Sequence, residues 1–272
     1  MGSRSKFGCW ILILTLTGSL TAGAESPEEK ALTQLWDQHQ KDPNQHQAIA
    51  DGCAQFEKSF PQSALIAVPR GLAAWHLLKL RKTEPATAIL NAMLSANSDV
   101  FSKAGNVIAQ RWLSRLDREK VKTALKAVYN KRIEYPASLD ALQSLPAPQK
   151  PPMTDRLGKP WTYSLQQFKQ FTAVSAQAYS LQSPTLGATS DIADALKIPY
   201  GDTLKLKPTR VMSPGGGGQS AIVEFETTGP NPQKSVLSEG TDVGGVSFVK
   251  AGEKMFILAN GDYWLIVPRP GG

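Results

Sequence analysis

The spacing of apolar residues changes along the chain, and this change restricts the available folds more than any other feature. From Glu25 to about Arg132, apolar side chains recur at helical spacing and nothing alternates like a strand. After Ile192 the sequence divides into short runs of β-forming residues that are separated by glycine and other turn residues. We therefore expect an α+β chain of several parts, with a helical N-terminal region and a C-terminal all-β sandwich or barrel.

The first 24 residues have the layout of a signal peptide. A basic start is followed by an apolar core from Trp10 to Leu16 and by a small-residue exit that ends at Ala24. The core is shorter than the roughly 20 apolar residues that a transmembrane helix needs. We expect cleavage after Ala24, no stable membrane span in the mature chain, and a periplasmic or secreted location. A retained anchor is the alternative.

The composition is that of a globular protein with a moderate positive charge. Hydrophobic residues make up 41% of the 272 residues, charged residues 19%, and the formal net charge is +7. Basic residues are spread along the chain, and the densest group, Arg115 to Lys122, also contains acids. We therefore expect this run to be a solvated helix face, and we expect no nucleic-acid partner.

Prolines separate the apolar stripes of the helical region into short helices, and Pro85 stands where a first helical turn tolerates it. The stretch from Phe56 to Leu94 resembles a tetratricopeptide repeat of exported bacterial proteins, with small residues inside its first helix and a second helix after Thr83. Pro69 departs from that pattern and should kink or shorten the first helix. A plain helical bundle is the alternative, and either arrangement would offer a surface to protein partners.

The middle of the chain predicts a helix over Arg118 to Lys131 that Tyr135-Pro136 stops, followed by a proline-rich loop and a strand. This order resembles the periplasmic domain of the major pseudopilins of type II secretion, although Leu157 stands where that family usually has tryptophan. The residues that carry the resemblance are Tyr135, Pro136, Asp155, Gly158, Pro160, Trp161 and Tyr163.

The same residues also have a structural interpretation that needs no substrate. The prolines and glycine fix turns, Trp161 and Tyr163 pack on one face of a strand, and Asp155 caps a turn through backbone amides. The resemblance implies a calcium-holding loop near residues 178–192, but that stretch offers only Asp191 as an acidic ligand. We therefore expect no bound calcium, and a pseudopilin-type module rather than a fibre subunit.

Six short strand-like segments follow Ile192, and Asn260-Gly261 between the last two predicts a hairpin. The turn residues of this region resemble the homology-region domain of the inner-membrane clamp subunit of type II secretion; they are Gly240, Gly244, Gly252, Asn260 and Gly261. That resemblance implies that the strand from Lys254 to Ala259, or its hairpin partner, adds to a strand of another protein. The candidate partner-binding residues are Phe256 and Ile257, on opposite sides of one strand, and Trp264.

Residue types that carry chemistry are sparse. The three histidines lack metal-ligand spacing, and His39 and His46 lie in a polar stretch that predicts exposure. Cys53 shares an apolar helical face and is expected to be a buried, inert thiol. The run of four glycines from Gly215 lacks the Lys-Ser/Thr of a phosphate loop. We expect no catalytic, metal or cofactor-binding residue, and no enzyme.

These observations predict a signal peptide (1–24), a tetratricopeptide-like helical region (25–117), a pseudopilin-like module (118–192) and a small β domain (193–272). The function that they favour is an exported, non-catalytic scaffold or adaptor acting with a type II secretion or type IV pilus-like assembly. The alternative is a helical-repeat protein-binding module of the cell envelope that is unrelated to secretion.

Overall fold

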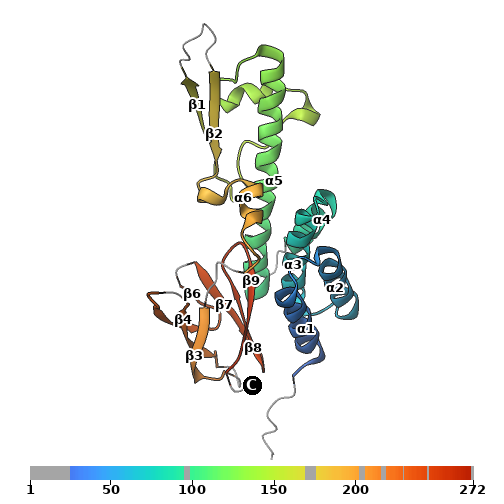
Figure 1. Ribbon diagram of the computed structural model, residues 1–272, viewed down its shortest axis with the longest axis vertical. Coiled ribbons are helices and arrows are strands. Elements are labelled where there is room, and N and C mark those ends of the chain that lie inside the picture. The colour runs from blue at the N-terminus through green and yellow to red at the C-terminus, as the bar shows by residue number, and fades with distance from the viewer. Residues whose placement is uncertain are drawn as a thin grey trace, which may run out of the picture.

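The structure is a computed structural model that describes residues 25–94, 99–168, 176–201, 206–215, 219–228, 230–243 and 245–270. The predicted signal peptide and three of the four clustered glycines lie outside these residues. The fold is α+β: helices come first, and antiparallel sheets follow (Figure 1). Within the described residues, no helix is both long and apolar enough to cross a membrane.

The N-terminal helices pack in succession, each against the next along the chain (Figure 1). Ser26 caps the first of them by accepting a hydrogen bond from the Glu29 amide. Pro69 and Pro85 both lie in first turns, where no backbone donor is needed. The predicted kink at Pro69 is therefore wrong, because its helix begins only two residues earlier. These helices are α1 (Pro27–Lys41), α2 (His46–Ser59), α3 (Ala67–Lys79) and α4 (Thr83–Met93).

The longest helix, α5 (Val100–Arg132), connects the two ends of the molecule (Figure 1). Asp99 caps it by accepting a hydrogen bond from the Ser102 amide, and Ile133 ends it in the left-handed conformation at φ 61°. The predicted stop before Tyr135-Pro136 is confirmed. The helix is continuous through residues 117 and 118, where the sequence predicts a boundary between two regions.

Beyond α5 the chain forms two short 3-10 segments, η2 (Leu139–Ser144) and η3 (Ala147–Gln149), and an antiparallel pair, β1 (Thr162–Phe168) and β2 (Ala176–Gln182). Helix α6 (Ile192–Lys197) follows and is capped by Asp191. The turns and the β1–β2 hairpin lie along the C-terminal half of α5 (Figure 1).

The last part of the chain forms two antiparallel sheets, in the orders β3-β4-β5 and β6-β7-β8-β9. The loop over Asn260-Gly261 joins β8 to β9, so the predicted hairpin is confirmed. The strands are β3 (Leu206–Ser213), β4 (Ile222–Thr227), β5 (Lys234–Ser238), β6 (Asp242–Val243), β7 (Val246–Ala251), β8 (Met255–Ala259) and β9 (Trp264–Pro268).

The buried apolar side chains form three groups. The largest combines helices α1 to α5 with α6 and with the helix-facing sides of β7, β8 and β9; we name it the shared core. A second group, the hairpin core, joins the C-terminal half of α5 to η2, Trp161 and Leu181. A third lies between the two sheets, where the rings of Phe225, Phe248 and Phe256 contact one another edge to face. The shared core thus joins the N-terminal helices to β7, β8 and β9.

Candidate functional site

The residues of the pseudopilin-like pattern lie together at the hairpin end of α5. The indole Nε1 of Trp161 donates to the Pro152 carbonyl at 2.8 Å, and the hydroxyl of Tyr163 donates to the Pro136 carbonyl at 2.8 Å. The ring of Tyr135 stacks on Tyr129 at a centroid distance of 4.6 Å. These contacts hold the loop after α5 against the hairpin, and they support the structural interpretation of the pattern.

Asp155 organises the turn that leads into β1. It accepts hydrogen bonds from the Leu157 and Lys159 amides, at 3.0 and 2.8 Å, so the predicted cap is confirmed. Its other oxygen accepts from the hydroxyls of Ser183 and Thr185, beyond the end of β2. Burial raises the pKa of Asp155, but these hydrogen bonds outweigh it and leave that pKa below its usual value. Gly158 completes the turn with φ 80°.

Asp191, the acidic residue of the loop after β2, bonds to cationic side chains. Its Oδ2 accepts from Arg118 at 2.8 Å and from Lys122 at 3.2 Å, and its Oδ1 caps α6. Burial raises the pKa of Asp191, but the hydrogen bonds from the α6 backbone and these cations lower it to about 2. The carboxylate is therefore ionised at neutral pH, and Arg118 and Lys122 already balance its charge.

The predicted solvated face at Arg115 to Lys122 is wrong. Arg115 is 1% exposed and Asp117 is 1% exposed. Arg115 donates to Asp262 Oδ1 at 2.8 Å and to the Thr189 carbonyl at 2.9 Å. The groups that accept hydrogen bonds from Arg115 lie in segments that are distant in sequence. The local alternation of charges therefore could not reveal them. This network joins α5 to both the 183–191 loop and the β8–β9 hairpin.

Of the two strands predicted as a docking edge, β8 is ruled out because it pairs with β7 on one side and with β9 on the other. Its hairpin partner β9 is the last strand in the described order of that sheet, so docking at β9 stays a prediction. Phe256, Ile257 and Trp264 are all 0% exposed. Phe256 packs between the two sheets, whereas Ile257 and Trp264 belong to the shared core. Phe256 and Ile257 do point to opposite sides, but the chain covers both of those sides itself. In this structure none of the three is accessible to a partner.

Glycine in α3 makes the contact of β9 with the helices possible. A Cβ added at Gly71 would lie 2.8 Å from Trp264 Cδ1, and one at Gly105 of α5 would lie 3.8 Å from Trp264 Cζ2. The indole therefore rests against the backbone of α3. Its Nε1 has no hydrogen-bond partner among the described residues.

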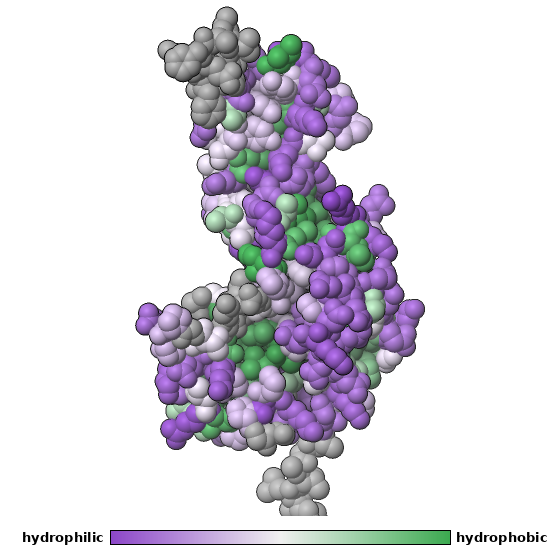
Figure 2. Space-filling model, in the orientation of Figure 1, coloured by the Kyte–Doolittle hydropathy of each residue, from purple (hydrophilic) through white to green (hydrophobic). Residues whose placement is uncertain are grey.

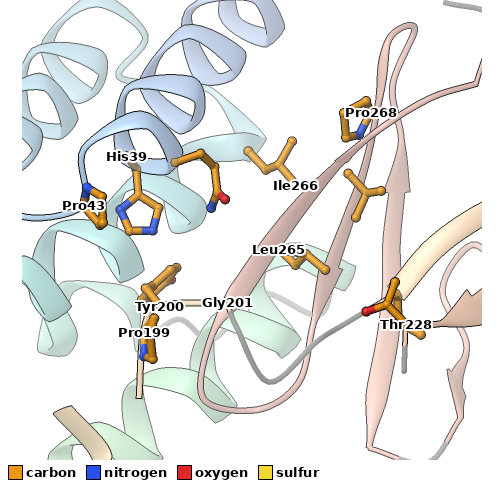
Figure 3. A pocket seen from close by; sticks show the side chains of 12 residues that line it. His39, Pro43, Pro199, Tyr200, Gly201, Thr228, Leu265, Ile266 and Pro268 are labelled. Atoms are coloured by element: carbon orange, nitrogen blue, oxygen red, sulfur yellow. The ribbon is translucent and has the colours of Figure 1, made fainter. Parts of the chain in front are cut away.

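A cleft of about 370 Å³ opens beside this contact. Figure 3 shows His39 and Pro43 on the helical side and Ile266 across from them on β9, with Tyr200 nearby. Figure 2 shows apolar side chains exposed at the level of β9. The volume is at the lower end of the range for small-ligand pockets, and the lining combines apolar surface with a few polar groups. This cleft is the candidate functional site.

A row of three histidines leads from the surface to the cleft. His46 Nδ1 lies 2.9 Å from His76 Nδ1, and His76 Nε2 lies 3.1 Å from His39 Nδ1. The His39 ring also contacts the Tyr200 ring, at a centroid distance of 5.8 Å. The predicted exposure of His39 and His46 is wrong for His39, which is 2% exposed, and His46 is half-buried; His76 is 0% exposed.

These contacts couple the tautomers of the neutral rings. When Nε2 of His76 carries the proton of that ring, Nδ1 of His39 accepts from it. His76 Nδ1 then accepts from His46 Nδ1, which leaves Nε2 of His46 as the outer acceptor. A proton taken up by His46 is compatible with this order, whereas a proton on His76 would break its bond to His46.

Burial keeps the inner part of the cleft uncharged. Desolvation lowers the pKa of His76 to about 3, reinforced by the neighbouring charges of His39, His46 and Lys79. Desolvation also lowers the pKa of His39 and raises that of Tyr200. Cys53 is buried as predicted, and burial raises the pKa of its thiol. The cleft can therefore accept a small neutral or apolar group.

Among the described residues, no group of three His, Cys, Asp or Glu side chains is arranged to hold a metal ion. Comparisons with protein-family models, with curated proteins and with solved structures found no match to this chain. Any functional assignment must therefore rest on the geometry and on the sequence pattern.

Proposed function

We propose that the chain is an exported, non-catalytic scaffold or adaptor that acts with a type II secretion or type IV pilus-like assembly. The observation that carries this proposal is the position of the β1–β2 hairpin. It packs on the C-terminal half of α5, at the other end of that helix from the β3–β9 sheets (Figure 1). A long helix, a Tyr-Pro turn and a small hairpin form the order in which this segment resembles a pseudopilin domain.

The proposal includes the division into a tetratricopeptide-like region (25–117), a pseudopilin-like module (118–192) and a β domain (193–272) that resembles the clamp subunit of type II secretion. Because α5 continues from the first region into the second, a scaffold of this form would hold the hairpin at a constant distance from the sheets. Arg111 and Arg115, both bonded to Asp262, reinforce that connection.

A second candidate is a helical-repeat protein-binding module of the cell envelope that is unrelated to secretion. The successive packing of α1 on α2, α2 on α3 and α3 on α4 favours it. In that case the hairpin would act only as a spacer.

Crosslinking in the native cell envelope, followed by affinity capture and mass spectrometry, separates the two candidates. The adaptor proposal expects secretion or pilus subunits among the crosslinked proteins. It also expects their loss in the double variant Ser164→Arg and Gln166→Arg, which changes two exposed positions of β1. The matched control is Val236→Arg, at a 50% exposed position of β5. Capture of proteins unrelated to secretion, unchanged by the β1 variant, would favour the second candidate.

A further inference from the structure

The groove between α4 and the C-terminal half of α5 has a volume of about 1070 Å³, larger than the cleft beside His39 and Tyr200. One face of α4 forms one side, with Thr83, Thr87 and Asn91 spaced four residues apart. A stripe of α5 forms the floor, and residues 148–151 together with Arg156 form the other side. We name this surface the α4–α5 groove.

The dimensions of the groove suit a helix. Its α5 stripe extends from Leu113 to Lys131, which at 1.5 Å per residue corresponds to about 27 Å, or five helical turns. The floor contains small side chains, including Ala124 and Ala127, that would let another backbone approach closely. Leu116 makes one end apolar, and Figure 2 shows apolar side chains gathered where α4 lies beside α5.

The charged residues that line the groove determine which sign of charge the polar edge of a bound helix must carry. Asp117 is buried and accepts from both Lys120, at 2.7 Å, and Arg156, so two cations surround one anion. Lys131 and Lys150 add two exposed cations to the same side. Two further acidic residues line the groove. Glu119 is already paired with Lys122 and Arg118 of α5, and Glu84 lies on the α4 side. The floor and the side formed by residues 148–151 and Arg156 therefore carry excess positive charge.

We propose that the α4–α5 groove binds an amphipathic helix of about five turns, with its apolar face on the small residues of α5 and an acidic edge along Lys120, Lys131 and Lys150. The bound helix would belong to a partner protein of the cell envelope, and only this assignment of its source rests on the proposed adaptor function. Binding by the groove can be tested without the assembly, so the two proposals can fail separately.

The test uses two 20-residue helical peptides with the same alanine- and leucine-based apolar face, one flanked by glutamates and the other by lysines. Their binding to the mature chain is measured by fluorescence anisotropy. We expect the acidic peptide to bind at least about tenfold more tightly than the basic one, and this preference to shrink as salt is added.

Variants of the groove locate the binding. Ala127→Arg should weaken the acidic peptide about tenfold or more by filling the floor, and Lys120→Glu with Lys150→Glu should do so by reversing the charge. Lys126→Glu, at an exposed α5 position outside the groove, is the matched control and should change little. If melting shows that Ala127→Arg is unfolded, Thr123→Arg at an exposed floor position replaces it.

Equal affinity for the two peptides would overturn the proposal, as would tight binding that survives the floor variants in folded protein. Sedimentation velocity adds one more outcome. A concentration-dependent dimer that Ala127→Arg abolishes would show that a second copy of this chain occupies the groove, and it would overturn the assignment to an acidic partner helix.

Discussion

The β8–β9 hairpin and the β1–β2 hairpin both pack on α5, but they are buried to different extents. All five residues of β8 are buried, because one face meets the other sheet and the other face meets the helices. In β1, exposed and half-buried residues alternate over positions 162–166, and one side remains open to solvent. The first hairpin is therefore part of the central packing, whereas the second is carried on the surface of α5.

Both junctions combine apolar and polar contacts, because Arg111 and Arg115 also bond to Asp262 in the β8–β9 turn and the hairpin core is apolar. Trp264 and Ile257 join β8 and β9 to the helices through apolar contact. Around the β1–β2 hairpin, Arg118 donates to the Leu181 carbonyl and to Asp191, and Asp155 links the turn before β1 to the loop after β2. Because the shared core and the hairpin core are separate, we expect the β8–β9 region and the helices to unfold as one cooperative unit and the hairpin core as a second, smaller one.

The largest expected effect comes from placing a charge in the apolar part of the β8–β9 junction. Ile257→Lys buries an unpaired ammonium between β8 and the helices, and it should cost about 4 kcal/mol or more of the free energy of unfolding. Phe256→Lys should be similarly severe, because its ring lies between the two sheets. Chemical denaturation monitored by circular dichroism measures both. A folded, stable Ile257→Lys variant would mean that β8 is not covered by the helices.

A large but more local effect is expected in the hairpin core. Trp161→Ala removes an indole that is 6% exposed, and it should cost about 3–5 kcal/mol of that unit's stability. Hydrogen exchange should rise in β1 and β2 while the amides of α3 and β8 stay protected. Equal loss of protection in both regions would show that the molecule is a single cooperative unit.

The helical region, which contains the three histidines, should lose stability first as the pH falls. The folded-state pKa values of His39, His46 and His76 all lie below the ordinary 6.5, so the unfolded chain binds protons first as the pH falls. The stability that the neutral row contributes is fully present above about pH 6.5 and declines below it toward the folded pKa of His76, about 3.

The slope of the free energy of unfolding should approach ~1.4 kcal/mol per pH unit for each such histidine. Urea unfolding between pH 7 and pH 5 measures it, in a range above the pKa values of the carboxylates. His76→Gln should be less stable at pH 7 and less sensitive to pH. Identical slopes in the two proteins would refute the role of the buried row.

The smallest effect is expected in the polar contacts around the β1–β2 hairpin. Asp191→Ala removes the cap of α6 and the partner of Arg118, and it should cost about 1 kcal/mol, in the range of a lost helix cap. Calcium should leave the melting temperature unchanged in both proteins, because Arg118 and Lys122 already compensate this carboxylate. A rise in melting temperature with calcium in the wild type alone would contradict that.

The sequence predicts those features of the fold that local spacing determines. Helical periodicity extends to the observed end of α5, Tyr135-Pro136 marks that end, and Asn260-Gly261 marks the β8–β9 turn. The continuity of α5 from Val100 escapes prediction, because its charged middle resembles a surface. Arg115 is buried only through Asp262 and Thr189, which lie 147 and 74 residues away along the chain.

The candidate cleft escapes prediction for the same reason, since His39, His76 and Tyr200 meet only after folding. One signal was present in β8. Its five consecutive residues MFILA are all apolar, a pattern typical of a strand buried on both faces rather than of an edge. The alternation of apolar and polar residues does not otherwise determine the order of strands in a sheet. The edge strand of this sheet could therefore not be located from the pattern alone.

The most direct test of the two-unit account is native-state hydrogen exchange on Ile257→Ala. Removing this side chain from the shared core should lower the opening free energy of β8 and of α3 by the same amount, about 2–4 kcal/mol. The protection of β1 and β2 should not change. A loss confined to β8 and β9, with α3 protected as in the wild type, would contradict the account and make the helices and the sheets separate units.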